Sequence, residues 1–525
     1  MEFIYSYAYI GILVSTVLWL FLKNKEMPTT FVSGGFLVSV LTYVLTLLLD
    51  DGSLIFKFLW LLPRDLSLFV LIVLFFNKFV KMPKVFYVGL AVVFMFFKFF
   101  YLDKVLMTSF NSPTFFEQYF TKPSEQKRTS KQEIQFIGNK LDPNAEVLID
   151  VKNPNDVSAI EKALIPYKST IQKAFPNLQH PEYSELDDYY TVNIPEDADL
   201  GDIFDVLTQT NQVDWIEENE MYQLNLPKVQ NPSPTPPKID YGINDPDLSK
   251  LWAFEQMKVA DLYAQIRKQN IQPVRKAKIA ILDTGIDFEH EDLNGNYIST
   301  NKEYDSDKQG HGTHCAGIAA AVSNNGKGIA SFAPNNQFVQ VTSIKVLSDE
   351  GWGTQKDILE GIILAADQKA DVISMSLGGP SNDLSQKAYE EAVKYANRAG
   401  AIMVVAAGNS NENAIDFSPA NVKGVIAVTA VDHNLKKAEF SNFITDLEMG
   451  LAAPGVAIFS TFPENSYMEL NGTSMATPYV AGLLGIMKSV TPDLTTKQAF
   501  DILNLKGIDT DNTKATGKFV QANVF

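Results

Sequence analysis

The chain has 525 residues, which leaves room for about three domains at roughly 150 residues each. Its formal net charge is −17 at pH 7, and its hydrophobic content of 46% is ordinary but unevenly spread. An acidic protein repels the phosphate backbone, which excludes nucleic acid as a partner, and a single cysteine, Cys315, excludes an intramolecular disulfide.

Residues 1–104 contain four apolar runs that are long enough to cross about 30 Å of hydrocarbon as helices. The runs are residues 4–22, 31–49, 62–80 and 85–101. Three spans follow the first, and no small-residue cleavage site is present, which argues against a cleaved signal peptide. We therefore predict an all-α, four-helix transmembrane region with the lipid bilayer as its partner.

Basic residues indicate how these spans are oriented. Lys23 and Lys25 follow the first span, and Lys78, Lys81 and Lys84 lie at the end of the third span and in the loop before the fourth, whereas Lys57 and Arg64 lie on the opposite side. The positive-inside rule favours both termini outside. The expectation is a multi-pass integral membrane protein whose remaining 421 residues, carrying a charge of −20, lie on the extracytoplasmic face.

Residues 105–140 are polar and are predicted to be a tether. Residues 141–226 then alternate between strand and helix patterns. With one short strand unassigned, this order predicts a small ferredoxin-like α+β domain, although a generic interaction module fits the pattern as well. A Pro-rich linker, residues 227–244, follows and is expected to be extended. The predicted strands are residues 145–152, 189–194 and 213–226, and the predicted helices are residues 156–175 and 200–208.

In residues 245–525, apolar strand patterns alternate with helical ones. This alternation predicts an α/β domain with a mostly parallel sheet and helices on both faces. Ligands bind at the carboxyl ends of such strands, and Asp283 lies at one of these ends. The predicted strands are residues 277–283, 337–346, 372–375, 402–406 and 425–431, and the helices lie near residues 311–321, 354–368, 382–399 and 474–489.

Five short motifs in this region contain reactive side chains. Taken singly, each residue has a simpler explanation. Asp283 could cap a turn, and His311 could lie at the start of a buried helix. Ser474 could be a helix N-cap, and Asn409 could be an ordinary loop residue. Together they supply an acid, a base, an oxyanion donor and a serine at a helix start. The motifs are DTG at 283–285, HGTH at 311–314, SMSLGG at 374–379, AAGN at 406–409 and GTSMATP at 472–478.

These motifs, in this order, resemble those of the subtilisin-like serine proteases, or subtilases (peptidase S8). The resemblance covers residues 245–525. It implies a subtilisin-like fold and a serine endopeptidase that works through an acyl-enzyme and needs no cofactor for catalysis. By resemblance, Asp283, His311 and Ser474 form the catalytic triad and Asn409 belongs to the oxyanion hole.

The resemblance also implies how a polypeptide substrate, an inhibitory segment and a metal would bind. Residues 141–226 are similar to the family's inhibitor I9-like propeptide, so we expect a self-processing zymogen that is cut between residues 224 and 244. A structural calcium ion would be held by Asp292, Asn325 and Ile329, although solvated loop residues are an equally good interpretation. The substrate would lie as an extended strand between Ser376, Leu377 and Gly378 on one side and Gly351, Trp352 and Gly353 on the other.

One position departs from the family pattern, since Tyr479 stands where most members have histidine, and we expect altered packing rather than lost activity. Cys315 is interpreted as a small buried residue under the histidine, not as a nucleophile. Two other functions stay open at this point. One is a catalytically silent pseudoprotease that binds peptides, and the other is a membrane sensor or transporter with an accessory protease.

Overall fold

The computed structural model describes residues 140–141, 146–153, 157–195, 197–224, 239–381 and 386–525. The predicted membrane spans and most of the tether lie outside these ranges and remain predictions. Among the residues so described, no helix is both long and apolar enough to cross a bilayer. The described ranges hold a small domain, residues 140–224, and a larger one, residues 239–525, within one compact unit.

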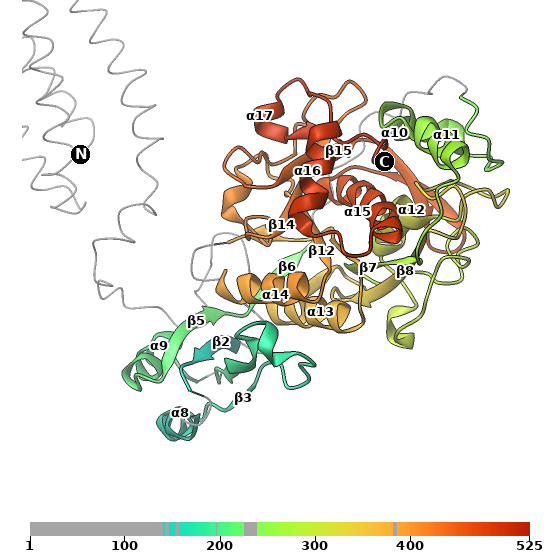
Figure 1. The fold of residues 1–525 in the computed structure, drawn as a ribbon. Helices are drawn as coiled ribbons and strands as arrows, with labels where there is room; N and C mark the ends of the chain where they lie inside the picture. The colour runs from blue at the N-terminus through green and yellow to red at the C-terminus, as the bar shows by residue number, and fades with distance from the viewer. Residues whose placement is uncertain (1–139, 142–145, 154–156, 196, 225–238, 382–385) are drawn as a thin grey trace, which may run out of the picture. The chain divides into compact units, whose positions relative to one another are not determined.

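A seven-stranded sheet, in which each pair of neighbouring strands is parallel, forms the centre of the larger domain (Figure 1). Its strand order is β18-β15-β14-β12-β10-β7-β8. The predicted α/β architecture is thereby confirmed. The strands are β7 (Ala277–Asp283), β8 (Val339–Lys345), β10 (Val372–Met375), β12 (Ile402–Ala406), β14 (Val425–Val431), β15 (Gly450–Pro454) and β18 (Lys518–Phe519).

Helices cover both faces of this sheet, which is why β10, β12 and β14 are buried along their whole length. In Figure 1, α13 and α14 lie on one face and α12 and α15 on the other. The helices of this domain are α10 (Trp252–Gln256), α11 (Val259–Gln269), α12 (His311–Ala320), α13 (Gln355–Asp367), α14 (Lys387–Arg398), α15 (Thr473–Val490), α16 (Thr496–Lys506) and α17 (Thr513–Thr516).

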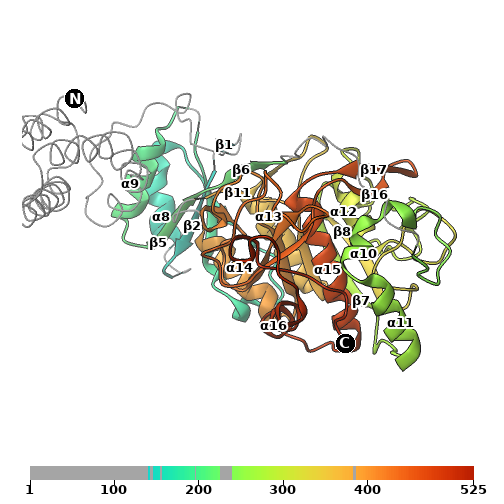
Figure 2. The same ribbon diagram turned by 90° about the horizontal axis from the view of Figure 1, so that it is seen from above.

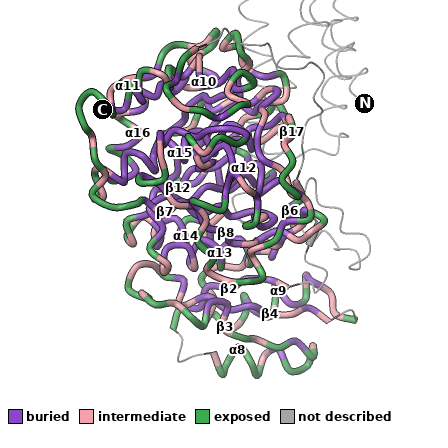
Figure 3. The backbone as a smooth tube through the Cα atoms, turned by 90° about the vertical axis from the view of Figure 1, so that its right-hand side faces the viewer, coloured by how far each residue is buried: buried purple, intermediate pink, exposed green. Residues whose placement is uncertain are grey.

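Helix α15 runs through the core, and all of it except Val490 is buried (Figure 3). Glycines let it approach its neighbours closely. A Cβ added at Gly482 would lie 2.9 Å from the Ala319 carbonyl oxygen of α12. Tyr479 is buried on the same helix with its ring 6.0 Å from that of Phe332, so the departure from the family pattern is accommodated by packing.

The small domain has a four-stranded antiparallel sheet of order β3-β4-β2-β5 with two helices in the connections. The element order βαββαβ with this strand order is the ferredoxin-like arrangement. Its apolar core lies between the sheet and α8 and α9. The elements are β2 (Glu146–Val151), α8 (Val157–Leu164), β3 (Ile171–Lys173), β4 (Tyr189–Asn193), α9 (Leu200–Gln209) and β5 (Val213–Glu218).

The predicted helix over residues 156–175 is wrong in its second half. Helix α8 ends at Leu164, a short 3₁₀ turn containing Pro166 follows, and Lys168 adopts a left-handed conformation that stops the helix. Ile171 therefore lies in β3, which is the short strand that the pattern left unassigned.

The predicted single strand over residues 213–226 is two strands. The first, β5, belongs to the small sheet, and the chain breaks at Asn219 before β6 (Glu220–Gln223). Strand β6 leaves that sheet and pairs on one side with β1 (Lys140–Leu141) and on the other with β9 (Trp352–Thr354) of the larger domain (Figure 2). The small domain thus extends a strand onto the larger one.

Because helix α15 contacts helix α12 at Gly482 with no room for a side chain, Gly482→Ala is expected to lower the free energy of unfolding by about 1–3 kcal/mol. Chemical denaturation followed by circular dichroism measures this. As a control, Leu505→Ala on α16 removes a side chain that is 82% exposed and should change stability by less than about 0.5 kcal/mol. Equal effects of the two substitutions would contradict the packing described for α15.

Candidate active site

Asp283 and His311 meet where strand β7 ends and helix α12 begins. The His311 Nδ1 atom lies 2.7 Å from Asp283 Oδ1, and both side chains are fully buried. The same carboxylate oxygen accepts the Thr284 backbone N–H at 2.8 Å. Since Nδ1 faces the carboxylate, the other ring nitrogen, Nε2, is the one directed away from the acid.

A second acid, Asp307, holds the start of α12 in place. Its carboxylate accepts the backbone N–H groups of Gly310 and Thr313 and the hydroxyls of Thr284 and Thr313, at 2.7 to 2.9 Å. Gly312 lets the helix touch the turn after β7, since an added Cβ would lie 2.1 Å from the Gly285 carbonyl oxygen. The sequence interpretation missed Asp307. Its role could have been inferred only from its position four residues before His311, because acidic residues stabilise the start of a helix.

The pKa of His311 is raised above its ordinary value as the net result of two opposing influences. Burial lowers the pKa, and the charge and hydrogen bond of Asp283, with a smaller contribution from Asp307, more than offset it. The imidazolium form is therefore favoured relative to a histidine in water. A neighbouring carboxylate such as Asp283 therefore helps a general base to hold a proton transiently, because it stabilises the protonated imidazole.

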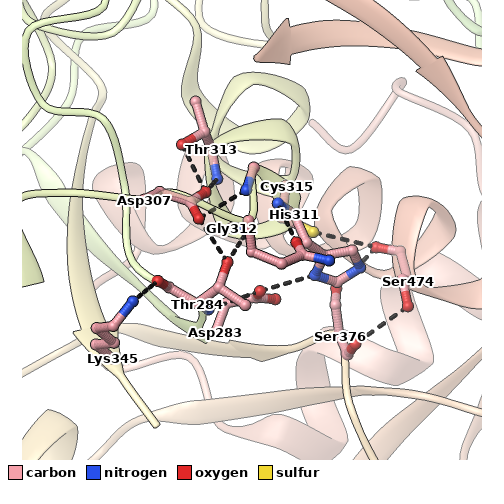
Figure 4. Close-up of polar contacts among 12 residues, drawn as sticks. Asp283, Thr284, Asp307, His311, Gly312, Thr313, Cys315, Lys345, Ser376 and Ser474 are labelled. Carbon is pink, nitrogen blue, oxygen red and sulfur yellow. Dashed lines mark hydrogen bonds and ion pairs between the residues drawn. The ribbon is translucent and has the colours of Figure 1, made fainter. Parts of the chain in front are cut away.

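Ser474 is the second residue of α15 and lies on the side of His311 away from Asp283 (Figure 4). Its hydroxyl donates to the Ser376 carbonyl oxygen at 3.1 Å, and the Ser376 hydroxyl donates to the Ser474 carbonyl oxygen at 2.7 Å. His311 Nε2 is buried and has no hydrogen-bond partner here. The structure thus brings acid, imidazole and hydroxyl to one site, with the hydroxyl turned towards Ser376.

Asn409 follows β12 and is oriented by the start of α15. Its side-chain oxygen accepts the backbone N–H and the hydroxyl of Thr473, each at 2.9 Å. Asn409 and Ser474 line one cavity of about 650 Å³. Among the predicted substrate-binding residues, Trp352, Ser376, Leu377 and Gly378 also line it.

The other histidine and thiol near the site have structural environments. Both His314 ring contacts go through Nε2, to the carbonyl oxygens of Ile458 and Met468, and burial lowers its pKa to about 3. Cys315 is fully buried, and burial raises the pKa of its thiol well above the ordinary value. Its Sγ lies 3.5 Å from the Ser474 carbonyl oxygen. A protonated, buried thiol is a poor nucleophile, in agreement with the sequence interpretation.

The tail of the small domain forms part of the cavity wall. In the β6–β9 pairing, Tyr222 lies opposite Gly353 and Gln223 opposite Trp352, and the Leu224 N–H donates to the Gly351 carbonyl oxygen at 3.0 Å. Met221 to Leu224 line the same cavity as Ser474. Residues 351–353 thus pair with an extended segment, as expected for a substrate, but the segment is the chain's own.

The small domain also caps two helices of the larger one. Glu217 Oε1 accepts the Ala388 N–H at the start of α14, and Asn219 Oδ1 accepts the Lys356 N–H at the start of α13. These N–H groups have no partner within their helices, and the helix dipole favours an acid there. Burial nevertheless raises the pKa of Glu217 to about 8.

The residues predicted to bind a metal lie together in a loop that does not line this cavity. Asp292 is fully buried, and its oxygens accept the Asn325 side-chain amide at 2.8 Å and the Ile329 backbone N–H at 2.7 Å. Asp245, which the sequence interpretation missed, is also buried and accepts the Asn324 and Asn325 backbone N–H groups. Burial, with a further contribution from Asp245, raises the pKa of Asp292 to about 7. Hard oxygens at this loop fit a divalent cation.

Comparisons with known proteins find relatives of about two-fifths of the chain. The sequence model of the subtilase family matches residues 275–518. Thermitase from Thermoactinomyces vulgaris is 44% identical over 218 residues, which are 41% of this chain and 75% of thermitase. Subtilisin DY from Bacillus licheniformis is 44% identical over 228 residues, which are 42% of this chain and 80% of that protein. A solved structure of proteases from Pseudoalteromonas arctica is 29% identical with a TM-score of 0.47, and the match covers 54% of this chain and 98% of that one.

The docking of Glu217 on α14 should depend on pH. Because its pKa rises from 4.5 to about 8 on burial, its stabilising contribution is complete below about pH 4.5 and is lost as the pH rises to about 8. Glu217→Gln stays neutral, so its melting temperature relative to the parent chain should increase from pH 5 to pH 8.5. Differential scanning calorimetry measures this, with Glu218→Gln as the neighbouring control. A difference that does not change with pH would contradict the burial of an ionisable Glu217.

Proposed function

The chain belongs to the subtilase family of serine endopeptidases, and on that premise we propose that Ser474, His311 and Asp283 carry out its peptide-bond hydrolysis. The observation that carries this proposal is the buried 2.7 Å contact between Asp283 and His311, with the Ser474 hydroxyl beside the same imidazole at the cavity. Polypeptides are the substrates.

In the proposed reaction, the Ser474 hydroxyl turns from the Ser376 carbonyl oxygen towards His311 Nε2, which takes its proton as the oxygen attacks the substrate carbonyl. The imidazolium then gives that proton to the leaving amine, and water hydrolyses the acyl-enzyme by the same steps in reverse. Asp283 holds the imidazole in the required tautomer and stabilises its charge without taking up a proton.

The oxyanion that forms on the substrate would accept the Asn409 side-chain amide and the Ser474 backbone N–H. The hydrogen bonds from Thr473 to the Asn409 oxygen support this role, because they orient the amide before substrate arrives. In subtilisin itself, loss of the corresponding donor costs about 10²–10³-fold in kcat.

Residues 141–226 are proposed to be the propeptide of a self-processing zymogen. Support comes from β6, which pairs antiparallel with β9, and from Glu217 and Asn219, which cap α14 and α13. While the tail lies along the cavity it competes with substrate, so the uncut chain would be inhibited. The proposed cut lies between residues 224 and 244.

A structural calcium ion is proposed at Asp245, Asp292 and Asn325, with the Ile329 segment beside it. Two buried carboxylates whose pKa values are both raised by burial fit a cation, because a divalent charge would offset the cost of burying them. The ion would tie the start of the domain to the 324–329 loop. It would take no part in the reaction.

Membrane anchoring through residues 1–104 is also a proposal, supported by the four apolar runs. It would place the catalytic domain at the extracytoplasmic surface of a bilayer. The runs contain few polar residues beyond Arg64 and Asp65, which favours anchoring over transport.

Ser474→Ala is expected to abolish both self-cleavage and labelling by a fluorophosphonate probe, because the nucleophile is removed. Intact mass spectrometry should find 58.4 kDa for this variant and a cut between residues 224 and 244 for the parent chain. Ser489→Ala, on the same helix, removes a hydroxyl that bonds only within the helix and should process like the parent. A parent chain that stays intact and unlabelled would instead support the pseudoprotease.

Calcium is expected to raise the melting temperature, by the equivalent of about 2.7 kcal/mol at a hundredfold excess over its Kd. Asp292→Asn should remove most of this shift, because one of the two buried carboxylates is lost. Asp247→Asn, a nearby acid paired with Lys250, should keep it. A calcium shift that survives in Asp292→Asn would place the ion elsewhere.

Deletion of residues 1–104 should move the protein from the membrane pellet to the supernatant after alkaline washing, if those residues are the anchor. Replacement by an unrelated anchor should restore both membrane association and processing, since the region supplies only attachment. Loss of processing with the unrelated anchor would support the sensor or transporter.

A further inference from the structure

The loop that carries Asn409 follows strand β12 and is held by the side chain of Asn442, which is fully buried. The Asn442 Oδ1 atom accepts two backbone N–H groups, from Ser410 at 2.9 Å and from Glu412 at 3.0 Å. Its Nδ2 atom donates to the Ala407 carbonyl oxygen at 2.9 Å. One side chain therefore binds the backbone on both sides of Asn409.

Asn442 also fits closely against Gly408, which directly precedes Asn409. The Asn442 backbone N–H donates to the Gly408 carbonyl oxygen at 2.9 Å. Gly408 has a φ of +105°, and an added Cβ there would overlap the Asn442 Nδ2 atom. A glycine is thus needed at position 408 both for its backbone conformation and for the approach of Asn442.

Asn442 is itself fixed to the central sheet through its neighbour Ser441, which is also fully buried. The Ser441 hydroxyl oxygen accepts the backbone N–H of Ala430 on β14 at 3.0 Å, and the same hydroxyl donates to the Asn442 carbonyl oxygen at 3.0 Å. The Lys437 ammonium group donates to the Ser441 carbonyl oxygen at 2.6 Å and to Asn411 Oδ1 at 2.8 Å. These contacts connect β14 to the loop that carries Asn409.

The Asn409 amide needs this second support because its other support reaches only one end of the side chain. Thr473 donates its N–H and its hydroxyl to Asn409 Oδ1, which holds the side-chain oxygen. The direction of the amide also depends on where the loop backbone lies. A donor aimed at a developing oxyanion works only if it is held within about 0.5 Å of its place before the substrate arrives.

From these contacts we infer that Asn442 is a positioning residue for the Asn409 oxyanion donor and acts through the backbone of residues 407–412. The inference rests on the proposed oxyanion role of Asn409 and adds the residue on which that role depends. Gly408, Asn409 and Ser410 line the cavity, whereas Asn442 is not among its lining residues, so Asn442 acts without touching substrate. A misplacement of about 1 Å can cost about 10²-fold in rate.

Asn442→Ala in the self-processed full-length chain tests the inference on an internally quenched peptide. We expect kcat to fall about 10- to 30-fold with KM within about twofold, because the oxyanion exists only in the transition state. Rates are normalised to the number of chains that fluorophosphonate labels at completion, so misfolded chains do not count. An unchanged kcat, or a change in KM alone, would overturn the inference.

Asn296→Ala is the matched control, since Asn296 is also buried and donates its side-chain amide to a carbonyl oxygen, that of Ala320. It does not line the cavity. Its kcat should stay within about twofold of the parent value, because it bonds no part of the Asn409 loop. A fall in kcat as large as that of Asn442→Ala would show a general effect of losing a buried amide and would overturn the inference.

Combination with Asn409→Ala separates positioning from a general loss of structure. Asn409→Ala alone should lower kcat about 10²–10³-fold. In that background Asn442→Ala should cost less than about threefold more, because no amide is left to position. The full tenfold loss in both backgrounds would overturn the inference. An Asn409→Ala chain with unchanged kcat would instead reject the proposed oxyanion role, so the two failures give different results.

Hydrogen exchange tests the same contacts without catalysis. In full-length Ser474→Ala, Asn442→Ala is expected to speed amide exchange at residues 410–412 about tenfold or more, because two N–H groups lose their acceptor. Asn442→Asp keeps that accepting oxygen and loses only the donor to Ala407. It should therefore retain slow exchange at residues 410–412 and, in the active chain, lower kcat by about three- to tenfold. Unchanged exchange in Asn442→Ala would overturn the inference.

Discussion

The parallel pairing of the central sheet is the constraint on which the site depends. In its register, Leu282 of β7 lies beside Met375 of β10, which lies beside Val405 of β12. All three strands therefore end at one edge, and the residues just beyond them, Asp283 among them, share that edge. Helix α15 then needs only to begin there for its second residue to join them. The site follows from strand direction and register, not from local sequence.

Much of this could be predicted, because the relevant signals are local. Strands β10, β12 and β14 have the predicted bounds, since each is a short run of buried apolar residues between polar or glycine-rich turns. Reactive side chains next to glycines could be picked out for the same reason. Local patterns also misled: the apolar Ile171 continued a helical spacing although Pro166 and Lys168 had already ended the helix.

What could not be predicted depends on partners far along the chain. Asp245 and Asp307 look like ordinary surface acids until folding buries them against the 324–325 amides and the start of α12. The break at Asn219 has the same origin, because β6 leaves its own sheet to pair with β9, more than a hundred residues away. The hydropathy pattern of a strand cannot show which of two sheets it will join. That choice depends on how the small domain packs against the larger one.

The strand that joins the two domains also sets how a cut beyond Leu224 would act. A tethered segment competes for its cleft at an effective concentration on the order of millimolar, whatever the amount of protein present. After a cut, occupancy would depend on how far the two fragments dilute apart. Cleavage of a single bond would thus convert an inhibition of the cleft that does not depend on protein concentration into one that ends when the two fragments diffuse apart. Inhibition would therefore last longer where the protein is crowded on a surface and would end sooner in dilute solution.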